Sequence, residues 1–153
     1  MSKFKVTKTF NYPVEDIFRG FLKITKREFP KFNEKNPIGI KHSRIVKDDG
    51  SVKLKMVMEV TKFEKNSVYE TTSKIHNDSY ISRYTFVKVN EETTKIVLEE
   101  EQYAKNFVSK IALVFQGLSG KSKTKEKINR MASGVIEEIE IVRTRQEKNA
   151  KKL

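Results

Sequence analysis

Residues 125–148, KEKINRMASGVIEEIEIVRTRQEK, decide the fold of this 153-residue chain. Apolar residues recur in this stretch at steps of three and four, which places them on one helical stripe roughly 140° wide. An amphipathic helix of this kind is stable only when its stripe is buried, so we expect the rest of the chain to cover it. Thr124 is the predicted N-cap, because its hydroxyl can accept a free backbone N–H of the first turn. The stripe consists of Ile128, Met131, Ala132, Val135, Ile139 and Val142.

Alternating apolar and polar residues predict strands through the middle of the chain. Turn residues separate these strands about every 12 residues, and helical patterns do not interrupt them, which indicates an antiparallel meander. The clearest strand begins at Val52. The five predicted strands are residues 38–46, 52–61, 68–75, 80–89 and 94–103.

The N-terminal part adds one more strand and a helical segment. Phe4, Val6 and Phe10 alternate with polar residues, and Pro13 then suits a helix start. An apolar helical face follows to about Phe29, with Gly20 as a predicted break between two short helices. We expect a single domain over residues 1–148 and a frayed basic tail over residues 149–153.

Composition narrows the class of protein. The chain has no cysteine, which excludes disulfides, and no apolar run near the ~20 residues that a membrane span needs. Its N-terminus lacks a signal-peptide core, so we expect a cytoplasmic protein. The net charge of +12 comes mostly from lysines spread along the whole chain. This spread favours solubility over nucleic-acid binding, which usually shows clustered charge. The sequence leaves monomer and homodimer open.

The order of the predicted elements, together with FNYPVEDIF at residues 10–18, resembles the START, polyketide-cyclase and birch-pollen-allergen-like (SRPBCC) superfamily. Within it, the chain is most similar to a bacterial family of unknown function. The resemblance implies an α+β helix-grip fold, in which a curved antiparallel sheet of about six strands wraps around the long C-terminal helix after a short helix pair. It also implies a cavity for an apolar ligand in many members, but fold alone does not choose a function.

Two strand faces supply the candidate cavity. Leu54, Met56 and Met58 alternate onto one face, and Tyr84 and Phe86 onto another. Methionine adapts to irregular shapes and suits a ligand cavity, although the same residues suit an ordinary core. The resemblance favours the cavity. The candidate residues are Leu54, Met56, Met58, Tyr84, Phe86, Glu100, Val135 and Ile139.

Glu100 raises the question of catalysis. It shares a strand face with Ile96 and Leu98, so an inward orientation would make it a buried carboxylate and a candidate acid or base. A strand end at the solvent, or an ion pair with a lysine, is the interpretation we favour. The two histidines, His42 and His76, show no metal-ligand spacing, and we expect neither a metal nor a cofactor.

Two further segments bear on function. Residues 104–118 have helical spacing and apolar residues almost all round, which favours packing over a lid, a membrane-surface helix or a docking helix. Gly120-Lys121-Ser122 lacks the first glycine of a phosphate-binding loop and is interpreted as a lysine-rich loop. We therefore expect a binding protein for a small apolar or amphipathic ligand, without catalysis. The alternatives are an interaction module with a basic surface and a cyclase- or hydrolase-like enzyme that uses a cavity carboxylate.

Overall fold

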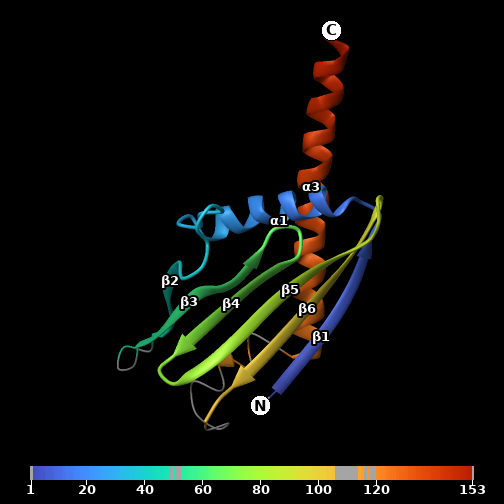
Figure 1. The fold of residues 1–153 in the computed structure, drawn as a ribbon. Helices are drawn as coiled ribbons and strands as arrows, with labels where there is room; N and C mark the ends of the chain where they lie inside the picture. Colours follow the sequence, from blue (N-terminus) through green and yellow to red (C-terminus); the bar gives the residue numbers. More distant parts are fainter. Residues whose placement is uncertain are drawn as a thin grey trace.

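Six strands form one antiparallel sheet, in the order β1-β6-β5-β4-β3-β2 (Figure 1). The computed structural model describes residues 2–48, 50, 53–105, 114–115, 117 and 120–152. Strands β2 to β6 are consecutive neighbours, which confirms the predicted meander, and β1 closes the order beside β6. The strands are β1 (Ser2–Phe10), β2 (Lys41–Asp48), β3 (Lys53–Glu64), β4 (Val68–Ile75), β5 (Asp78–Asn90) and β6 (Thr93–Tyr103).

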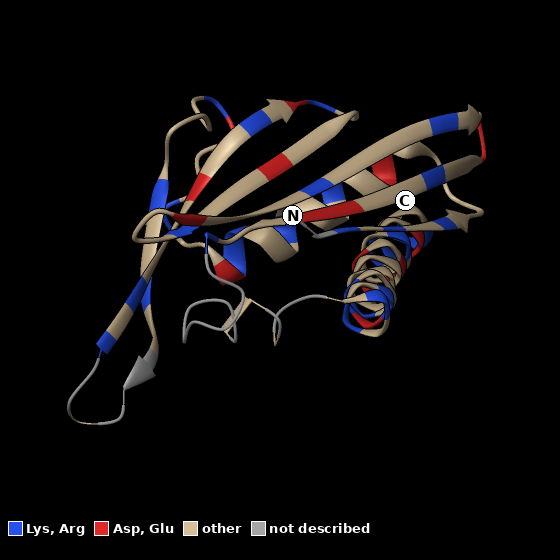
Figure 2. Cartoon of the chain, turned by 90° about the horizontal axis from the view of Figure 1, so that it is seen from below, with Lys and Arg blue, Asp and Glu red and all other residues tan. Residues whose placement is uncertain are grey.

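Two helices, α1 (Val14–Glu28) and α3 (Lys121–Lys151), lie on the same side of the sheet (Figure 2). Their apolar faces and the inward residues of the strands make the main core. This arrangement confirms the α+β helix-grip architecture that the sequence predicted. The inner faces of β3 and β5 carry Met58, Tyr84 and Phe86, as the alternation indicated.

The segment after β1 is one helix of 15 residues, so the predicted helix pair is wrong. Gly20 is not a break but the point where α1 crosses α3. A Cβ at Gly20 would lie 3.2 Å from both Cγ1 and the carbonyl oxygen of Val135. A Cβ at Gly134 of α3 would lie 2.9 Å from Cδ1 of Ile24. Each glycine thus lets the other helix approach closely, and the sequence pattern could not distinguish this role from a chain break.

The long helix begins at Lys121, four residues before the predicted start, and it includes the stretch interpreted as a loop. Gly120 is its N-cap residue, with φ of 133°. Thr124 is therefore not the cap. Its hydroxyl instead donates a hydrogen bond of 2.8 Å to Oε1 of Glu100. The cap prediction failed because Thr124 lies inside the helix, where its N–H bonds to the carbonyl oxygen of Gly120.

At its other end α3 continues to Lys151, beyond the predicted end at Lys148. Its last inward contacts are with the start of α1, where Arg143 lies 3.4 Å from Asp16 and its guanidinium lies over the ring of Tyr12. Residues 144–152 are exposed, and the helix projects past the sheet (Figure 1). No helix in the described part of the chain is long and apolar enough to cross a membrane.

The buried residues fall into two clusters. The larger lies between the sheet and both helices and contains Phe18, Phe21 and Phe86. The smaller contains Leu54, Met56, Ile75, Tyr80 and Phe115. Phe115 is fully buried and its ring stacks on Tyr80 at 6.0 Å between centroids. Most of the predicted 104–118 helix lies outside the described residues.

Candidate functional site

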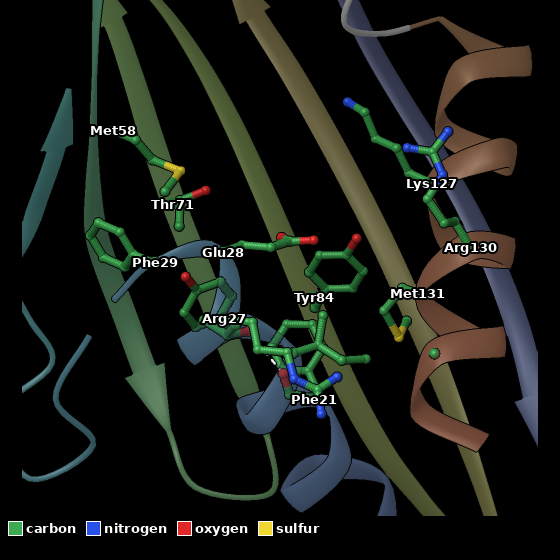
Figure 3. Close-up of a pocket in the computed structure, with 14 residues that line it drawn as sticks. Phe21, Arg27, Glu28, Phe29, Met58, Thr71, Tyr84, Lys127, Arg130 and Met131 are labelled. Atoms are coloured by element: carbon green, nitrogen blue, oxygen red, sulfur yellow. Dashed lines mark hydrogen bonds between the residues drawn. The ribbon is translucent and has the colours of Figure 1, made fainter. Parts of the chain in front are cut away.

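A pocket of about 530 Å³ opens between the sheet, the C-terminal half of α1 and the N-terminal half of α3 (Figure 3). Its volume suits a small molecule, since ligand pockets generally hold several hundred Å³. The two helices meet at Gly20 and Val135. On one side of that crossing, two helix segments line the pocket. They are the part of α1 that ends at Glu28 and the part of α3 that begins near Lys127. Separation of the helices beyond the crossing therefore creates the space.

Aromatic and sulfur-containing side chains supply six of the fourteen residues of the pocket wall. Phe21 holds the wall together, with its ring 5.3 Å from that of Tyr69 and 5.0 Å from that of Tyr84. Tyr69 and Tyr84 are direct cross-strand partners on β4 and β5, which places both rings on the inner face. Met58 and Met131 complete the apolar surface from β3 and α3. Such a wall favours an apolar or aromatic ligand body.

Three hydroxyl groups in this wall are free to bind a ligand. The hydroxyls of Tyr69, Thr71 and Tyr84 have no hydrogen-bond partner within the described part of the chain. Tyr69 and Thr71 are nonetheless only 7% and 8% exposed. Burial, and then the negative charge of Glu28, raises the pKa of both tyrosines, so both stay protonated at neutral pH. These hydroxyls are accessible from the pocket, where a polar group of a ligand would bond them.

Four charged side chains, Arg27, Glu28, Lys127 and Arg130, stand around the pocket. The three cations each contact a carboxylate that does not line the pocket. Glu28 is exposed and has neither a hydrogen-bond nor an ion-pair partner among the residues that the structure describes. The pairs of the cations are Arg27–Glu138, Lys127–Glu100 and Arg130–Glu126.

The buried Glu100 bonds to side chains of α3 and does not line the pocket. It is fully buried on the inner face of β6, and its Oε2 lies 2.8 Å from Nζ of Lys127. Lys127 also donates a hydrogen bond to the hydroxyl of Tyr80, and Thr124 donates to the other carboxylate oxygen. The lysine pair that we favoured on sequence grounds is therefore present, although the residue faces inward. This network fixes the first turns of α3 against β5 and β6.

The predicted cavity residues fall in four places. Met58 and Tyr84 line the pocket, and Glu100 lies behind Lys127. Leu54 and Met56 belong to the smaller core cluster. Phe86, Val135 and Ile139 are packed in the main core.

Sequence reasoning missed Tyr69 and Thr71 on β4, together with Phe21, Phe29 and Glu28 at the end of α1. Alternation in β4 could have grouped Tyr69 with Thr71, but residues of both faces there are polar, so the inward face had no signal. Neither histidine lines the pocket, although His42 packs against the lining residue Phe29, at 5.5 Å between ring centroids. His76 is exposed with φ of 51°. Across the described ranges, no three residues of metal-binding type cluster.

Solved structures of low sequence identity share this fold. A protein from Arthrobacter aurescens matches with a TM-score of 0.59 and 13% identity, over 88% of this chain and 86% of that one. A protein from Thermus thermophilus matches with a TM-score of 0.55 and 13% identity, over 92% of this chain and 99% of that one. A protein from Mesorhizobium loti matches with a TM-score of 0.52 and 16% identity, over 94% of this chain and 98% of that one. At such identities the likeness shows the fold alone, which is the helix-grip fold.

The particular family follows from the sequence. The chain belongs to the DUF3284 family, described as a domain of unknown function, whose model matches residues 4–120. The match includes α1 and nearly the whole sheet and ends where α3 begins. A comparison with curated proteins gives no match. The expected membership of a family of unknown function is therefore confirmed.

Proposed function

We propose that this protein binds a small amphipathic molecule in the pocket between α1, α3 and the sheet, and that its role is binding and not catalysis. One observation carries the proposal. The aromatic wall presents to the pocket the hydroxyls of Tyr69 and Thr71, two residues that are otherwise buried, and no other described residue bonds these hydroxyls. An apolar ligand body would fill the wall, and a polar group on the same ligand would satisfy these hydroxyls.

The arrangement of Glu100 supports binding over acid–base chemistry. Its two oxygens are engaged by Thr124 and Lys127 at 2.8 Å each, and it does not line the pocket. A carboxylate that acts on a ligand needs to reach the ligand within hydrogen-bond distance. Glu100 instead serves to hold α3 in place, and the sequence-based candidate for a catalytic acid or base loses its support.

Two measurements test the proposal. Native mass spectrometry of the freshly purified protein would reveal a ligand retained from the cell. Calorimetric titration with naphthylethanol, an uncharged aromatic alcohol, would measure binding by the pocket itself. We expect binding in the micromolar to millimolar range, given a ligand of this size.

The control is a substitution that fills the pocket. Met58 is only partly buried and lines the wall, so Met58→Trp should fold and occupy the ligand space. We expect it to lower the affinity for naphthylethanol at least tenfold, whereas Met58→Leu should retain most of it. Absence of binding by the wild-type protein, or equal binding by wild type and Met58→Trp, would reject the pocket as the site.

A further inference from the structure

One charged residue of the pocket lining, Glu28, differs in sign from the net charge of the chain. The whole sequence carries a net charge of +12, and three of the four charged lining residues are basic. Those three cations are already paired with carboxylates outside the lining, and Lys127 is held most fully, by Glu100 and Tyr80. Of the four charged lining residues, Glu28 is the one whose charge has no partner within the described part of the chain.

Glu28 acts on the inside of the pocket and not only on solvent. Its side chain extends across the pocket toward Tyr84 (Figure 3). After burial, its negative charge is the next cause that raises the pKa of Tyr69 and of Tyr84. The field of this carboxylate therefore reaches both hydroxyls.

The remaining partners in the wall also favour a hydrogen-bond donor with a positive charge. The hydroxyl oxygens of Tyr69, Thr71 and Tyr84 can each accept a hydrogen bond. The rings of Tyr69 and Tyr84, with those of Phe21 and Phe29, present aromatic surface on several sides of the pocket. A cation within about 6 Å of an aromatic face is attracted by its quadrupole.

Resting on the proposed binding function, we infer that the polar group of the ligand is a protonated amine, carried on an apolar or aromatic skeleton. The ammonium group pairs with Glu28, donates hydrogen bonds to the hydroxyl oxygens of the wall and lies against the tyrosine rings. The skeleton occupies the space between Phe21 and Met131. An anionic group in the same position would face Glu28 without a free cation to balance it.

The test compares three ligands that share one ring system: naphthylethylamine, naphthylethanol and naphthylacetate. At neutral pH they carry a positive, no and a negative charge, so the ring contribution cancels in each ratio. We expect the amine to bind about five- to tenfold more tightly than the alcohol, and the acetate to bind more weakly than the alcohol. The preference for the amine should decrease as salt concentration rises.

Glu28→Gln tests the residue that carries the inference. Because Glu28 is exposed, the variant should fold normally. It should bind naphthylethanol as the wild type does while losing the preference for the amine. Glu137→Gln, which removes an exposed carboxylate of α3 outside the lining, changes the net charge equally and should keep the preference.

The outcomes separate this inference from the proposed function. If the alcohol and the amine bind equally and Met58→Trp weakens both, the binding function holds and the amine is wrong. If the acetate binds best, the paired cations of the rim, and not Glu28, select the ligand, and the inference is overturned. If none of the three ligands binds, the proposed function fails and the inference fails with it.

Discussion

The space between sheet and helices is closed at one end and open at the other. At the closed end, Phe18 of α1 packs on Phe86 of β5 at 5.0 Å, and Val135 and Ile139 of α3 are 0% and 1% exposed. At the open end, the same two helices line a pocket. Phe21 joins the two regions, since its ring contacts Phe86 on one side and Tyr84 on the other.

The difference shows that residue type alone does not create a cavity. Both ends contain aromatic and aliphatic side chains of similar size. The closed end lies where glycines allow α1 and α3 to approach, and the open end lies where the helices have separated beyond that crossing. We therefore expect substitutions at the closed end to change stability and those in the pocket wall to change ligand binding.

The largest effect is expected for Phe18→Ala at the closed end. Phe18 is 2% exposed and contacts the rings of Phe21, Phe63 and Phe86. Truncating such a residue leaves a cavity and should lower the free energy of unfolding by about 3–5 kcal/mol. Urea denaturation followed by circular dichroism measures it, with the exposed Val89→Ala as a control. A loss below about 1 kcal/mol would contradict a tightly packed closed end.

Thr124→Val should have the next largest effect. The substitution removes the hydroxyl that donates to the fully buried Glu100 and leaves that oxygen without this partner. Hydrogen bonds to charged groups contribute about 1.5–3 kcal/mol, so we expect a loss in that range. Thr144→Val, at an exposed position of the same helix, controls for the helix propensity of valine. Equal stability of the two variants would show that the Glu100 network contributes little.

The helix crossing gives a smaller, paired prediction. Gly20→Ala places a Cβ against the backbone of Val135, which should cost about 1–3 kcal/mol, offset by up to about 1 kcal/mol of helix propensity. Gly134→Ala meets only the flexible end of Ile24, so it should be neutral or slightly stabilising. Thermal unfolding of both variants measures the contrast. A reversed order would mean that the closed end does not depend on Gly20.

Acid should weaken the contact between α1 and α3 through Glu138. Burial raises the pKa of this carboxyl group, but its bonds to Arg27 and Lys23 outweigh burial and hold the pKa below its ordinary value of 4.5. Its contribution to stability is therefore complete above that value and lost as the pH falls through the lower, folded-state pKa. Unfolding free energies measured from neutral to acid pH should decrease less in Glu138→Gln than in the wild type. The exposed Glu137→Gln should follow the wild type, and a Glu138→Gln curve parallel to the wild type would contradict the prediction.

The smallest effect is expected for Thr71→Val in the pocket wall. Like Thr124, Thr71 is buried, but its hydroxyl has no partner among the described residues. Replacing it with an apolar group of the same shape should change the free energy of unfolding by less than about 0.5 kcal/mol. Urea denaturation beside Thr124→Val gives the comparison. A loss above about 1 kcal/mol would show that the hydroxyl serves the fold and is not reserved for a ligand.

Some features of the site could be predicted and others could not. Alternation correctly placed Met58 and Tyr84 on inward faces, and both line the pocket. The same rule selected Phe86, which is packed at the closed end because α1 covers it. Glu28 carried no signal, since an exposed glutamate at a helix end is ordinary in any sequence. The role proposed for Glu28 rests on a difference in pairing: the three lining cations have carboxylate partners, and Glu28 has no partner among the described residues.

The sequence by itself determined the alternation of strands and the amphipathic stripe of α3, because periodicity depends on local geometry. The order of these elements then carried the resemblance that implied the helix-grip fold. Only the tertiary structure decided that Gly20 is a crossing point, that Thr124 binds Glu100, and where the pocket opens. These three features depend on contacts between residues far apart in the chain. The distance and angle between two packed helices produce no periodic pattern in the sequence of either helix.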